Sequence, residues 1–232
     1  MVLRRRPGRS QRRLASKVVI PRPDLLAEED LPSPPHQKRS LEKRARLKAA
    51  GRALFGAKGY ERASVEKIAE RAGLAVGTFY QHFRSKRQLL LSLMNELLER
   101  LSQLNLRPAA ELDARAGLDH LLSHAFSTDL QYLGVYRAWQ EAVLFDPDLA
   151  RKQSEIHAWT TARVESLFRL LSEQPGARPG VDIPSLARVM DSFFWNLLPQ
   201  AFDMPKVELE RSIRSSAHLI YHALFKDPPG KS

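Results

Sequence analysis

Apolar residues recur every three or four positions along most of this chain, which is the spacing of an amphipathic helix. The first such run begins at Ser40 with SLEKRARLKAAGRALFGAKGY, and Gly59 is expected to end it. We expect Ser40 to be the N-cap of this helix. Gly51 lies inside the run, where glycine costs up to about 1 kcal/mol relative to alanine. We therefore expect another helix to cross closely at Gly51.

Two short helical patterns follow in SVEKIAERAGLAVGTFYQHF, which starts at Ser64. Ser64 is expected to cap the first helix, and Gly73 to end it in the left-handed conformation that glycine tolerates best. Ala75 then starts a second helix that runs to Phe83, with Phe79 and Phe83 pointing back onto the domain. Two helices joined by three or four residues that include a glycine make a helix-turn-helix.

The remainder of the chain predicts longer helices separated by proline and glycine. No alternating strand pattern persists, and no internal repeat is present. Asp146 and Asp148 are expected to form a turn and an N-cap around Pro147. We therefore predict an all-α fold of about nine helices, in which a three-helix unit is followed by helices at 85–104, 110–128, 130–144, 148–173, 184–202 and 205–226.

The first 39 residues differ from the rest, because they are rich in proline, arginine and serine and carry no periodic apolar face. Such a composition favours a disordered basic arm. The expected organisation is an arm at 1–39, the helix-turn-helix domain at 40–88, a helical domain at 89–226 and a tail at 227–232.

Positive charge is concentrated at the front of the chain. The formal net charge is +11, of which residues 1–40 contribute +6 and residues 41–90 contribute +8, whereas residues 91–232 contribute −3. A basic front with a mildly acidic back suggests that one end meets a polyanion. A basic tail without a specific partner is the alternative.

Cysteine is absent, which excludes a disulfide framework, cysteine-based zinc sites and a cysteine nucleophile. No apolar run approaches the roughly 18 residues of a membrane span. The start, MVLRRRPGRSQRRL, lacks the apolar segment of a signal peptide, since Pro7 and Gly8 interrupt it. We therefore expect a cytoplasmic protein without a membrane partner.

No GxSxG, P-loop, GxGxxG or HExxH motif occurs in the sequence. His120 and His124 have the i,i+4 spacing of metal ligands, as do His218 and His222, but neither pair has a nearby third ligand. We expect no catalytic residue, no cofactor and no metal site.

The segment 55–90, FGAKGYERASVEKIAERAGLAVGTFYQHFRSKRQLL, resembles the DNA-binding domain of TetR-family (tetracycline-repressor-like) transcriptional regulators. The family often has serine at the start of the recognition helix, where this chain has Ala75, and polar residues where it has Val76. The resemblance covers roughly residues 41–92, and beyond them only the all-α architecture is implied. It is carried by Phe55, Gly59–Tyr60, Ser64–Val65, Ile68–Ala69, Ala72–Gly73, Gly77–Thr78, Tyr80, Phe83, Lys86 and Leu89–Leu90.

The resemblance implies that the second helix of the motif lies in the major groove, with its N-terminal residues on base edges. Gly77 permits close approach, and Thr78 offers a hydroxyl and a methyl group. Gln81 can pair in bidentate fashion with adenine, and Val76 suits an apolar contact with a thymine methyl. We therefore expect Val76, Gly77, Thr78 and Gln81 to contact bases.

Phosphate contacts are expected around this helix. Tyr80 and His82 suit phosphates at its two sides, and backbone N–H groups at helix starts favour phosphate through the helix dipole. Ser64 and Lys86 stand at such helix starts, and the matching positions in family members contact the DNA backbone. Half-buried surface residues without this role are the alternative reading for Tyr80 and His82.

A single recognition helix binds weakly, so we expect a homodimer that spaces two such helices about one DNA turn apart. The last two helices are the expected interface, and the resemblance implies a four-helix bundle formed by this pair. An isologous patch must be apolar and self-complementary. The candidates, for which a place in the chain's own core is the alternative, are Phe193, Leu197, Ile213, Ile220 and Leu224.

Aromatic residues gather in the middle of the chain, where family members enclose a cavity for a small inducing molecule. Apolar walls with a few polar groups suit such a pocket, although aromatics at helical spacing also serve as plain core. The effector is expected to be hydrophobic or amphipathic, such as an acyl thioester, a lipid or a drug. The expected pocket residues are Phe126, Tyr136, Trp139, Trp159, Arg163 and Asn196.

Together these features predict a ligand-responsive regulator, with a bias towards repression, that binds a palindromic operator in double-stranded DNA and is nucleoid-associated when bound. Two alternatives remain open. One is a protein that coats DNA without regard to sequence, and the other is a TetR-like regulator that answers to no small molecule.

Overall fold

The computed structural model describes residues 21–33, 37–104 and 114–226, apart from the side chains of residues 114 and 125–130. Within these ranges the chain forms nine α-helices and one 3-10 turn, with no β-strand, so the predicted all-α class is confirmed. The elements are α1 (Lys38–Arg62), α2 (Val65–Arg71), α3 (Val76–His82), α4 (Lys86–Gln103), α5 (Ala114–Asp129), the turn η1 (Leu130–Tyr132), α6 (Leu133–Val143), α7 (Pro147–Ser172), α8 (Ile183–Gln200) and α9 (Lys206–Leu224).

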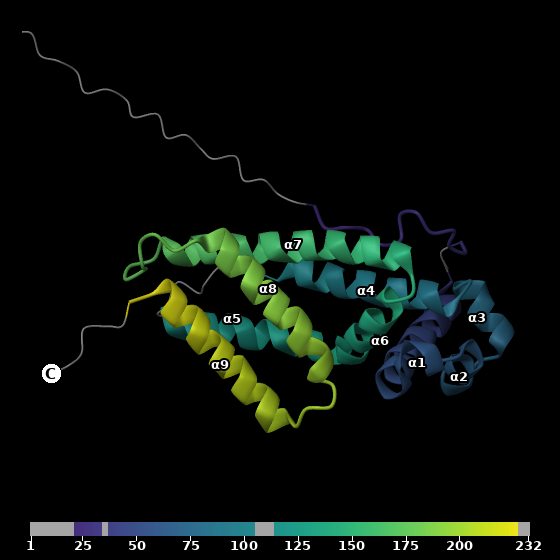
Figure 1. The fold of residues 1–232 in the computed structure, drawn as a ribbon. Coiled ribbons are helices and arrows are strands. Elements are labelled where there is room, and N and C mark those ends of the chain that lie inside the picture. The colour runs from purple at the N-terminus through teal and green to yellow at the C-terminus, as the bar shows by residue number, and fades with distance from the viewer. Residues whose placement is uncertain (1–20, 34–36, 105–113, 227–232) are drawn as a thin grey trace, which may run out of the picture.

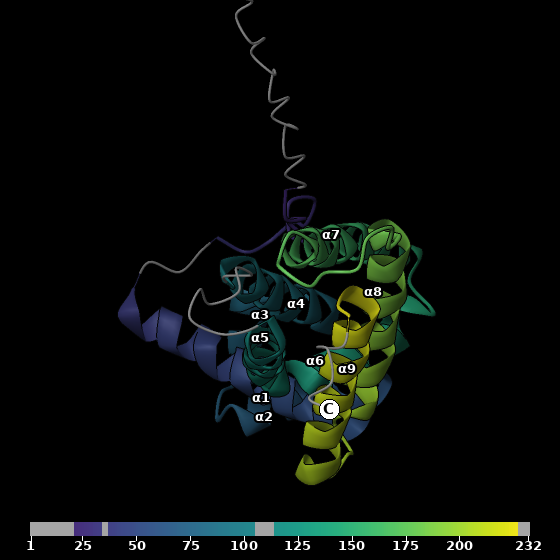
Figure 2. The same ribbon diagram turned by 90° about the vertical axis from the view of Figure 1, so that its left-hand side faces the viewer.

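The molecule is elongated, with α1, α2 and α3 gathered at one end (Figure 1). Helices α4 and α7 run lengthwise away from this end, and α6 packs on α1 near the middle. The turned view shows α8 and α9 together on one side of the molecule (Figure 2). None of the helices in the described ranges is long and apolar enough to span a membrane.

Helices α2 and α3 form the predicted helix-turn-helix. The Ser64 Oγ accepts a hydrogen bond from the Lys67 backbone N–H at 3.3 Å, which confirms the predicted cap of α2. Gly73 has a φ of 62°, in the left-handed region that glycine adopts without strain. Phe79 and Phe83 are fully buried, so they hold α3 against the rest of the domain as expected.

The start of α1 differs from the prediction. Its N-cap is Gln37, whose side chain makes no capping hydrogen bond, and Ser40 lies inside the first turn. The expected cap at Ser40 is therefore wrong, because an apolar pattern defines the buried face of a helix better than its first residue. Gly59, which was expected to end the helix, has a non-helical φ of 76° and marks a kink, beyond which helical structure continues to Arg62.

Two glycines of α1 lie at close helix contacts. A Cβ added to Gly51 would come within 2.6 Å of the Leu89 side chain of α4, which confirms the predicted close crossing. Gly56 lies against Gly134 of α6. Both α4 and α6 therefore connect the helix-turn-helix end to the rest of the molecule. The expected domain boundary between residues 88 and 89 falls inside the continuous helix α4.

Residues 21–33 form a strap that crosses α4 close to the start of α7. Leu25 is buried in the main core. Its backbone N–H and the Arg22 Nη1 donate to the Asn95 Oδ1 of α4 at 3.0 and 2.9 Å. The expected disordered arm is therefore wrong for residues 21–33, because one apolar side chain and several polar contacts anchor them. The rest of the arm, residues 1–20 and 34–36, and the tail at 227–232 lie outside the described residues.

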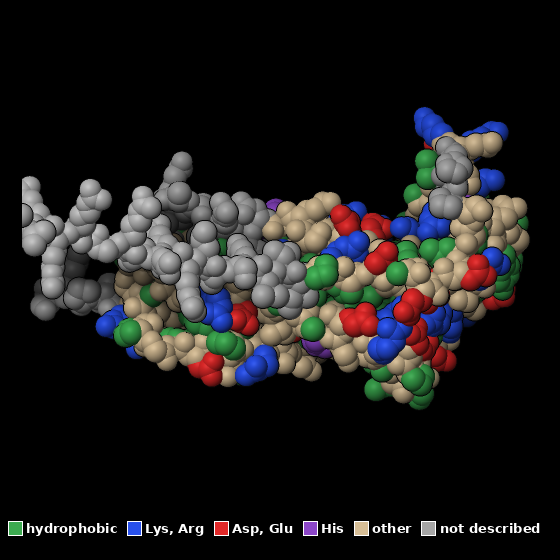
Figure 3. Space-filling model, turned by 90° about the horizontal axis from the view of Figure 1, so that it is seen from above, with side chains coloured by type: hydrophobic (Ala, Val, Ile, Leu, Met, Phe, Trp, Pro, Cys, Tyr) green, Lys and Arg blue, Asp and Glu red, His purple; other side chains and the backbone are tan. Residues whose placement is uncertain are grey.

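The acidic part of the strap lies on basic residues. Asp30 forms an ion pair with Arg84 at 3.0 Å, and Glu29 forms one with Arg87 at 2.7 Å. The Arg87 guanidinium also pairs with the two acids that flank Pro147, at the start of α7. Seen from above, acidic and basic side chains are interspersed over this end of the molecule (Figure 3).

A second, smaller core lies between α5, α7, α8 and α9, at the end of the molecule away from the helix-turn-helix. Ile220 and Leu224 are fully buried in it, beside Phe168. The expectation that Ile220 and Leu224 form a dimer interface is therefore wrong, because each is covered by helices of its own chain.

Candidate nucleic-acid interface and internal cavity

The outer surface of α3 presents the residues that were expected to contact bases. Val76, Gly77 and Gln81 are exposed, and Thr78 is half-buried. No heavy atom other than those of its own helix and chain neighbours lies within 4 Å of a Cβ added to Gly77, so this part of the helix is open to an incoming surface. Tyr80 is 50% exposed beside it. The arrangement suits insertion into a groove, because the helix is anchored behind and unobstructed in front.

His82 does not share this surface. Its side chain is 3% exposed, and its carbonyl oxygen accepts a hydrogen bond from the Arg44 Nη1 of α1 at 3.0 Å. Burial lowers the pKa of His82, and the positive charges of Arg44 and Lys43 lower it further. An uncharged, buried imidazole is not placed to meet a phosphate, so the expected phosphate contact of His82 is not supported.

Lys86 is fixed by the end of α1. Its Nζ donates to the carbonyl oxygens of Tyr60 and Glu61 at 2.9 and 3.2 Å, and lies 4.4 Å from the centroid of the Tyr60 ring. The lysine charge therefore neutralises the negative end of the α1 dipole. The backbone N–H of Lys86, in the first turn of α4, is the part of this residue that can face a phosphate.

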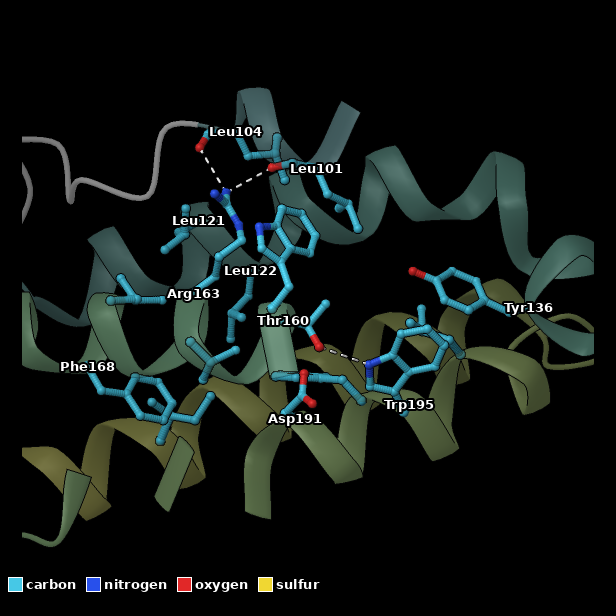
Figure 4. Close-up of a pocket in the computed structure, with 16 residues that line it drawn as sticks. Leu101, Leu104, Leu121, Leu122, Tyr136, Thr160, Arg163, Phe168, Asp191 and Trp195 are labelled. Atoms are coloured by element: carbon cyan, nitrogen blue, oxygen red, sulfur yellow. Dashed lines mark hydrogen bonds between the residues drawn. The ribbon is translucent and has the colours of Figure 1, made fainter. Parts of the chain in front are cut away.

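An internal cavity of about 150 Å³ lies between α4, α5, α6, α7, α8 and α9 (Figure 4). Three of the residues expected to form a pocket line it, namely Tyr136, Trp159 and Arg163. Leucine side chains of α4, α5, α7 and α8 form much of the remaining wall. A cavity of this volume is comparable to one that binds benzene, so it suits a small ligand.

Two of the other expected pocket residues, Trp139 and Asn196, do not line the cavity. Trp139 is buried behind it, where its Nε1 donates to the Gln153 Oε1. Asn196 is exposed, and its side chain donates to the Ser192 carbonyl at 2.8 Å. Both expectations are wrong, because the sequence does not tell which side of a helix faces the cavity. The side chain of Phe126 lies outside the described residues.

Two polar residues of the cavity wall were missed. Asp191 and Thr160 both line the cavity, and Asp191 is almost completely buried. The signal in the sequence was an acid inside the apolar run VMDSFFW, where a surface helix would place it on the outside. The Asp191 Oδ2 accepts hydrogen bonds from the Thr161 Oγ1 at 2.9 Å and from the His157 Nδ1 at 3.3 Å.

Arg163 faces the end of α4. Its Nη2 donates to the carbonyl oxygens of Leu101 and Leu104 at 2.8 and 3.4 Å, and its guanidinium lies over the Trp159 ring at 5.1 Å. Burial lowers the pKa of Arg163. The charge is stabilised by the carbonyl oxygens at the helix C-terminus and by the indole face.

A groove on the surface runs between α8 and α9. Phe193 and Leu197 line it from α8, and Val207 and Leu219 line it from α9. Both α9 residues are largely exposed, Leu219 at 61% and Val207 at 64%. Ile213 does not line the groove and is half-buried between the two cores. Of the expected interface residues, Phe193 and Leu197 therefore remain candidates.

The two histidine pairs lie on α5 and α9. The rings of His120 and His124 are 6.5 Å apart, and those of His218 and His222 are 4.2 Å apart. Among the residues that the structure describes, no group of three or more potential ligands is placed to hold a metal ion.

Residues 47–93 match the sequence profile described as "Bacterial regulatory proteins, tetR family". The HTH-type transcriptional repressor KstR of Rhodococcus jostii (strain RHA1) is 39% identical over 83 residues, which are 36% of this chain and 37% of KstR. The HTH-type transcriptional regulator TcmR of Streptomyces glaucescens is 33% identical over 134 residues, or 56% of this chain and 57% of TcmR. The alignments thus span about a third of one relative and just over half of the other.

The fold is shared over a larger part of the chain. A solved SmeT–triclosan complex has a TM-score of 0.62 and 23% sequence identity, covering 82% of this chain and 96% of SmeT. The similarity therefore extends beyond the helix-turn-helix to the helices that enclose the cavity. At this level of identity it shows the fold of the part that it covers.

Proposed function

We propose that this chain, whose residues 47–93 place it in the tetR family of bacterial regulatory proteins, is a sequence-specific DNA-binding transcriptional regulator. The observation that carries the proposal is the geometry of α3, whose exposed N-terminal half is held from behind by Phe79 and Phe83. By analogy with the repressor KstR, we assign it a repressing role. It would act in the cytoplasm and on the nucleoid.

Base reading is assigned to the outer surface of α3. Thr78 and Gln81 would read base edges in the major groove, while Val76 would contact a thymine methyl. Gly77 would let the helix backbone come close to the bases, since a side chain there would project into the open space in front of α3. The half-exposed Tyr80 would bind a phosphate.

Two helix starts would add phosphate contacts. Ser64 caps α2, and Ser85 caps α4 through its Oγ, which accepts the Gln88 N–H at 3.2 Å. Backbone N–H groups of the first turns, including that of Lys86, would face the DNA backbone with the positive end of the helix dipole. These contacts position the recognition helix without reading sequence.

A dimer formed through the α8–α9 groove would bring two recognition helices to one palindromic operator. The groove is apolar along Phe193, Leu197 and Leu219, and it lies on a side of the molecule that the chain's own helices leave uncovered. A two-fold axis through such a surface pairs it with itself. The dimer would thereby match two half-sites about one DNA turn apart.

The internal cavity is proposed to bind a small hydrophobic or amphipathic effector that releases the operator. The cavity is connected to the DNA-binding end by α6. Tyr136 of α6 lines the cavity, and Gly134, two residues earlier, contacts α1. Glu141 of the same helix accepts the Tyr60 N–H at 2.6 Å. A ligand that moves α6, or α4 through Leu101, would change the spacing of the two recognition helices.

The proposal is tested by selecting DNA from a random library with the purified full chain at physiological salt. A palindrome should be enriched, and Thr78→Ala and Gln81→Ala should each relax the preference at one position per half-site, at a cost of about 1–3 kcal/mol. Gln174→Ala, which alters an exposed glutamine in the loop after α7, serves as the matched control. Tight binding without enrichment, fading steeply with salt, would instead indicate a protein that coats DNA.

A further inference from the structure

We propose that the internal cavity is a site for a small organic cation, namely a protonated amine carried by an aromatic or branched aliphatic body, and that Asp191 binds its ammonium group. The inference rests on the proposed function, since it names the class of effector that the same cavity would take. It is carried by three observations: an oxygen of a buried carboxylate to which no described residue donates, a series of hydrogen bonds that places no positive charge beside this carboxylate, and aromatic walls of suitable size.

The first observation is the incomplete hydrogen bonding of Asp191. Its side chain is 5% exposed, and it lines a cavity whose wall is mostly apolar. An ionised carboxylate offers acceptor sites on both oxygens. In the described part of the chain, the two protein donors, on His157 and Thr161, both bind Oδ2. No described side chain donates to the Asp191 Oδ1. A ligand in the cavity could therefore donate a hydrogen bond to this oxygen.

The second observation concerns the charge of the neighbouring imidazole. The Trp139 Nε1–H can only donate, and it donates to the Gln153 Oε1. This fixes the orientation of the Gln153 amide, whose Nε2 lies 2.5 Å from the His157 Nε2. Because an amide nitrogen only donates, the His157 Nε2 must accept. The imidazole proton therefore resides on Nδ1 and is donated to Asp191.

A neutral His157 does not cancel the charge of the carboxylate. A second proton on the imidazole would place two donors, the His157 Nε2–H and the Gln153 amide, against each other. The series of hydrogen bonds from Trp139 through Gln153 and His157 thus orients the Asp191 carboxylate. It stabilises the anion without adding a positive charge. A buried carboxylate without a positive partner is costly, and a cationic ligand would remove that cost.

Arg163 does not supply the missing charge. Its guanidinium is directed to the Leu101 and Leu104 carbonyls, and no ion pair within 4.0 Å joins it to Asp191. The close-up shows the two residues on different sides of the cavity (Figure 4). The cavity therefore has a negative side at Asp191 and a positive side at Arg163. Arg163 is half-buried and already bound to the end of α4, so it is the weaker of the two anchors for a ligand.

The third observation is the wall beside the carboxylate. The ring of Trp195 lies 5.3 Å from that of Tyr136 and 4.7 Å from that of His157, and its Nε1 donates to the Thr160 Oγ1 at 3.3 Å. The rings are thus held in place next to Asp191. Aromatic faces attract an ammonium group in addition to packing on an apolar body. A cavity of about 150 Å³ suits a ligand with a single ring.

The test compares three probes of nearly equal shape on the full chain: 2-phenylethylammonium, 2-phenylethanol and 3-phenylpropionate. Binding is followed by calorimetry and by tryptophan fluorescence, since Trp159 and Trp195 line the cavity. We expect the ammonium to bind at least about tenfold more tightly than the alcohol, and the carboxylate to bind most weakly. Asp191→Asn keeps the shape and one acceptor oxygen, and it should reduce ammonium binding to the level of the alcohol.

Arg163→Gln is the opposite test, because it removes the positive charge of the cavity and should strengthen ammonium binding while weakening carboxylate binding. The inference is overturned if the carboxylate binds best in wild type and loses its affinity in Arg163→Gln, or if wild type does not distinguish the three probes. The relative affinities of the three probes for the wild-type protein test the inference even if Asp191→Asn does not fold.

The role of this ligand in regulation is measured separately, as operator affinity with and without 2-phenylethylammonium. Operator release that depends on Asp191 supports both the ligand class and the proposed function. Binding that requires Asp191 but leaves operator affinity unchanged would support the ligand class and contradict the effector role. A failure of the proposed ligand class can therefore be distinguished from a failure of the proposed regulatory function.

Discussion

Gly134 of α6 lies directly against Gly56 of α1, so closely that a Cβ added to Gly134 would come within 2.5 Å of the Gly56 Cα. Two helices approach to this distance only where neither carries a side chain. The contact joins the helix that supports the helix-turn-helix to the helix that bears Tyr136 in the cavity wall. It is a direct physical connection between the two proposed sites.

Gly134→Ala should destabilise the protein by about 1–3 kcal/mol. The nearest atoms to the new methyl group would be the Gly56 Cα, the Gly56 backbone nitrogen and the Arg52 carbonyl oxygen, at 2.5, 2.8 and 3.2 Å. All three belong to the backbone of α1 and cannot rotate away, so α1 and α6 must separate. Urea denaturation of the variant and wild type measures the difference.

Gly77→Ala is the control for this prediction, because a Cβ at Gly77 meets nothing within 4 Å. We expect Gly77→Ala to leave stability unchanged or to raise it by up to about 1 kcal/mol, as alanine favours the helix. The same variant should weaken operator binding, since its methyl group projects towards the DNA. Equal stability of Gly134→Ala and wild type would show that α1 and α6 are not in close contact.

Removal of the Asp30 charge should increase the attraction of the protein for DNA. Asp30 of the strap pairs with Arg84, which follows the recognition helix by two residues. Asp30→Asn would remove the negative charge beside Arg84, although the Arg84 Nε would keep its hydrogen bond to the backbone carbonyl at position 30. Affinity at low salt should therefore rise, and the slope of log K against log salt should steepen by up to about 1. A salt titration of DNA binding measures both.

Asp203→Asn provides the matched control. Asp203 is likewise an exposed acid in an ion pair, with Arg137 at 3.3 Å, but it follows α8. The control should leave the salt dependence of DNA binding as in wild type. Identical curves for Asp30→Asn and Asp203→Asn would mean that the strap does not shield Arg84 from DNA.

Alkaline pH should destabilise the protein through Tyr132. Burial raises the pKa of Tyr132 to about 12, and the hydrogen bond to Glu96 and the Glu96 charge act in the same direction. The unfolded tyrosine has a pKa of about 10. The protonated tyrosine therefore contributes stability that is fully present below pH 10 and is lost as pH rises towards 12.

The midpoint of thermal unfolding, measured from pH 8 to 12, should fall over this window. Tyr132→Phe should flatten the fall and should cost about 1.5 kcal/mol at neutral pH, because Glu96 loses its hydrogen bond. Some alkaline dependence should remain in the variant, since burial and nearby charges also raise the pKa of Tyr60 to about 12. A variant with the wild-type pH profile would contradict the assignment to Tyr132.

Leu219→Asp should convert the proposed dimer into a monomer. Leu219 lines the apolar groove and is 61% exposed, so the substitution places a charge in the interface with little effect on the core. Phe145→Asp alters an exposed apolar side chain between α6 and α7, away from the groove, and should leave the dimer intact. Light scattering after size-exclusion chromatography measures the mass of each variant. A dimeric Leu219→Asp would place the interface elsewhere.

Local features of the sequence were sufficient to predict the helix-turn-helix. The cap at Ser64, the left-handed Gly73 and the buried anchors Phe79 and Phe83 depend on neighbours a few residues away, and the structure confirms each of them. The fold class follows in the same way, because apolar spacing decides between helix and strand without reference to distant parts of the chain. Helix ends were less certain, as the error at Ser40 shows.

The positions of side chains relative to other helices could not be obtained in this way. The sequence shows that His82, Asn196 and Ile220 lie on helices, but not that His82 is covered by α1, that Asn196 faces outwards or that Ile220 is enclosed by its own chain. The same holds for Asp191, whose burial in the cavity wall depends on helices from distant parts of the sequence.

The sequence alone was thus enough to predict which segments are helical and where the helix-turn-helix lies. Only the tertiary structure decided which charges are shielded, which apolar residues are covered and what chemistry the cavity offers. The physical reason is that helix formation and capping are governed by interactions within a few residues. Burial and the pairing of charges instead depend on how the helices pack. The amphipathic pattern shows which face of a helix is buried, but not which other helix covers that face.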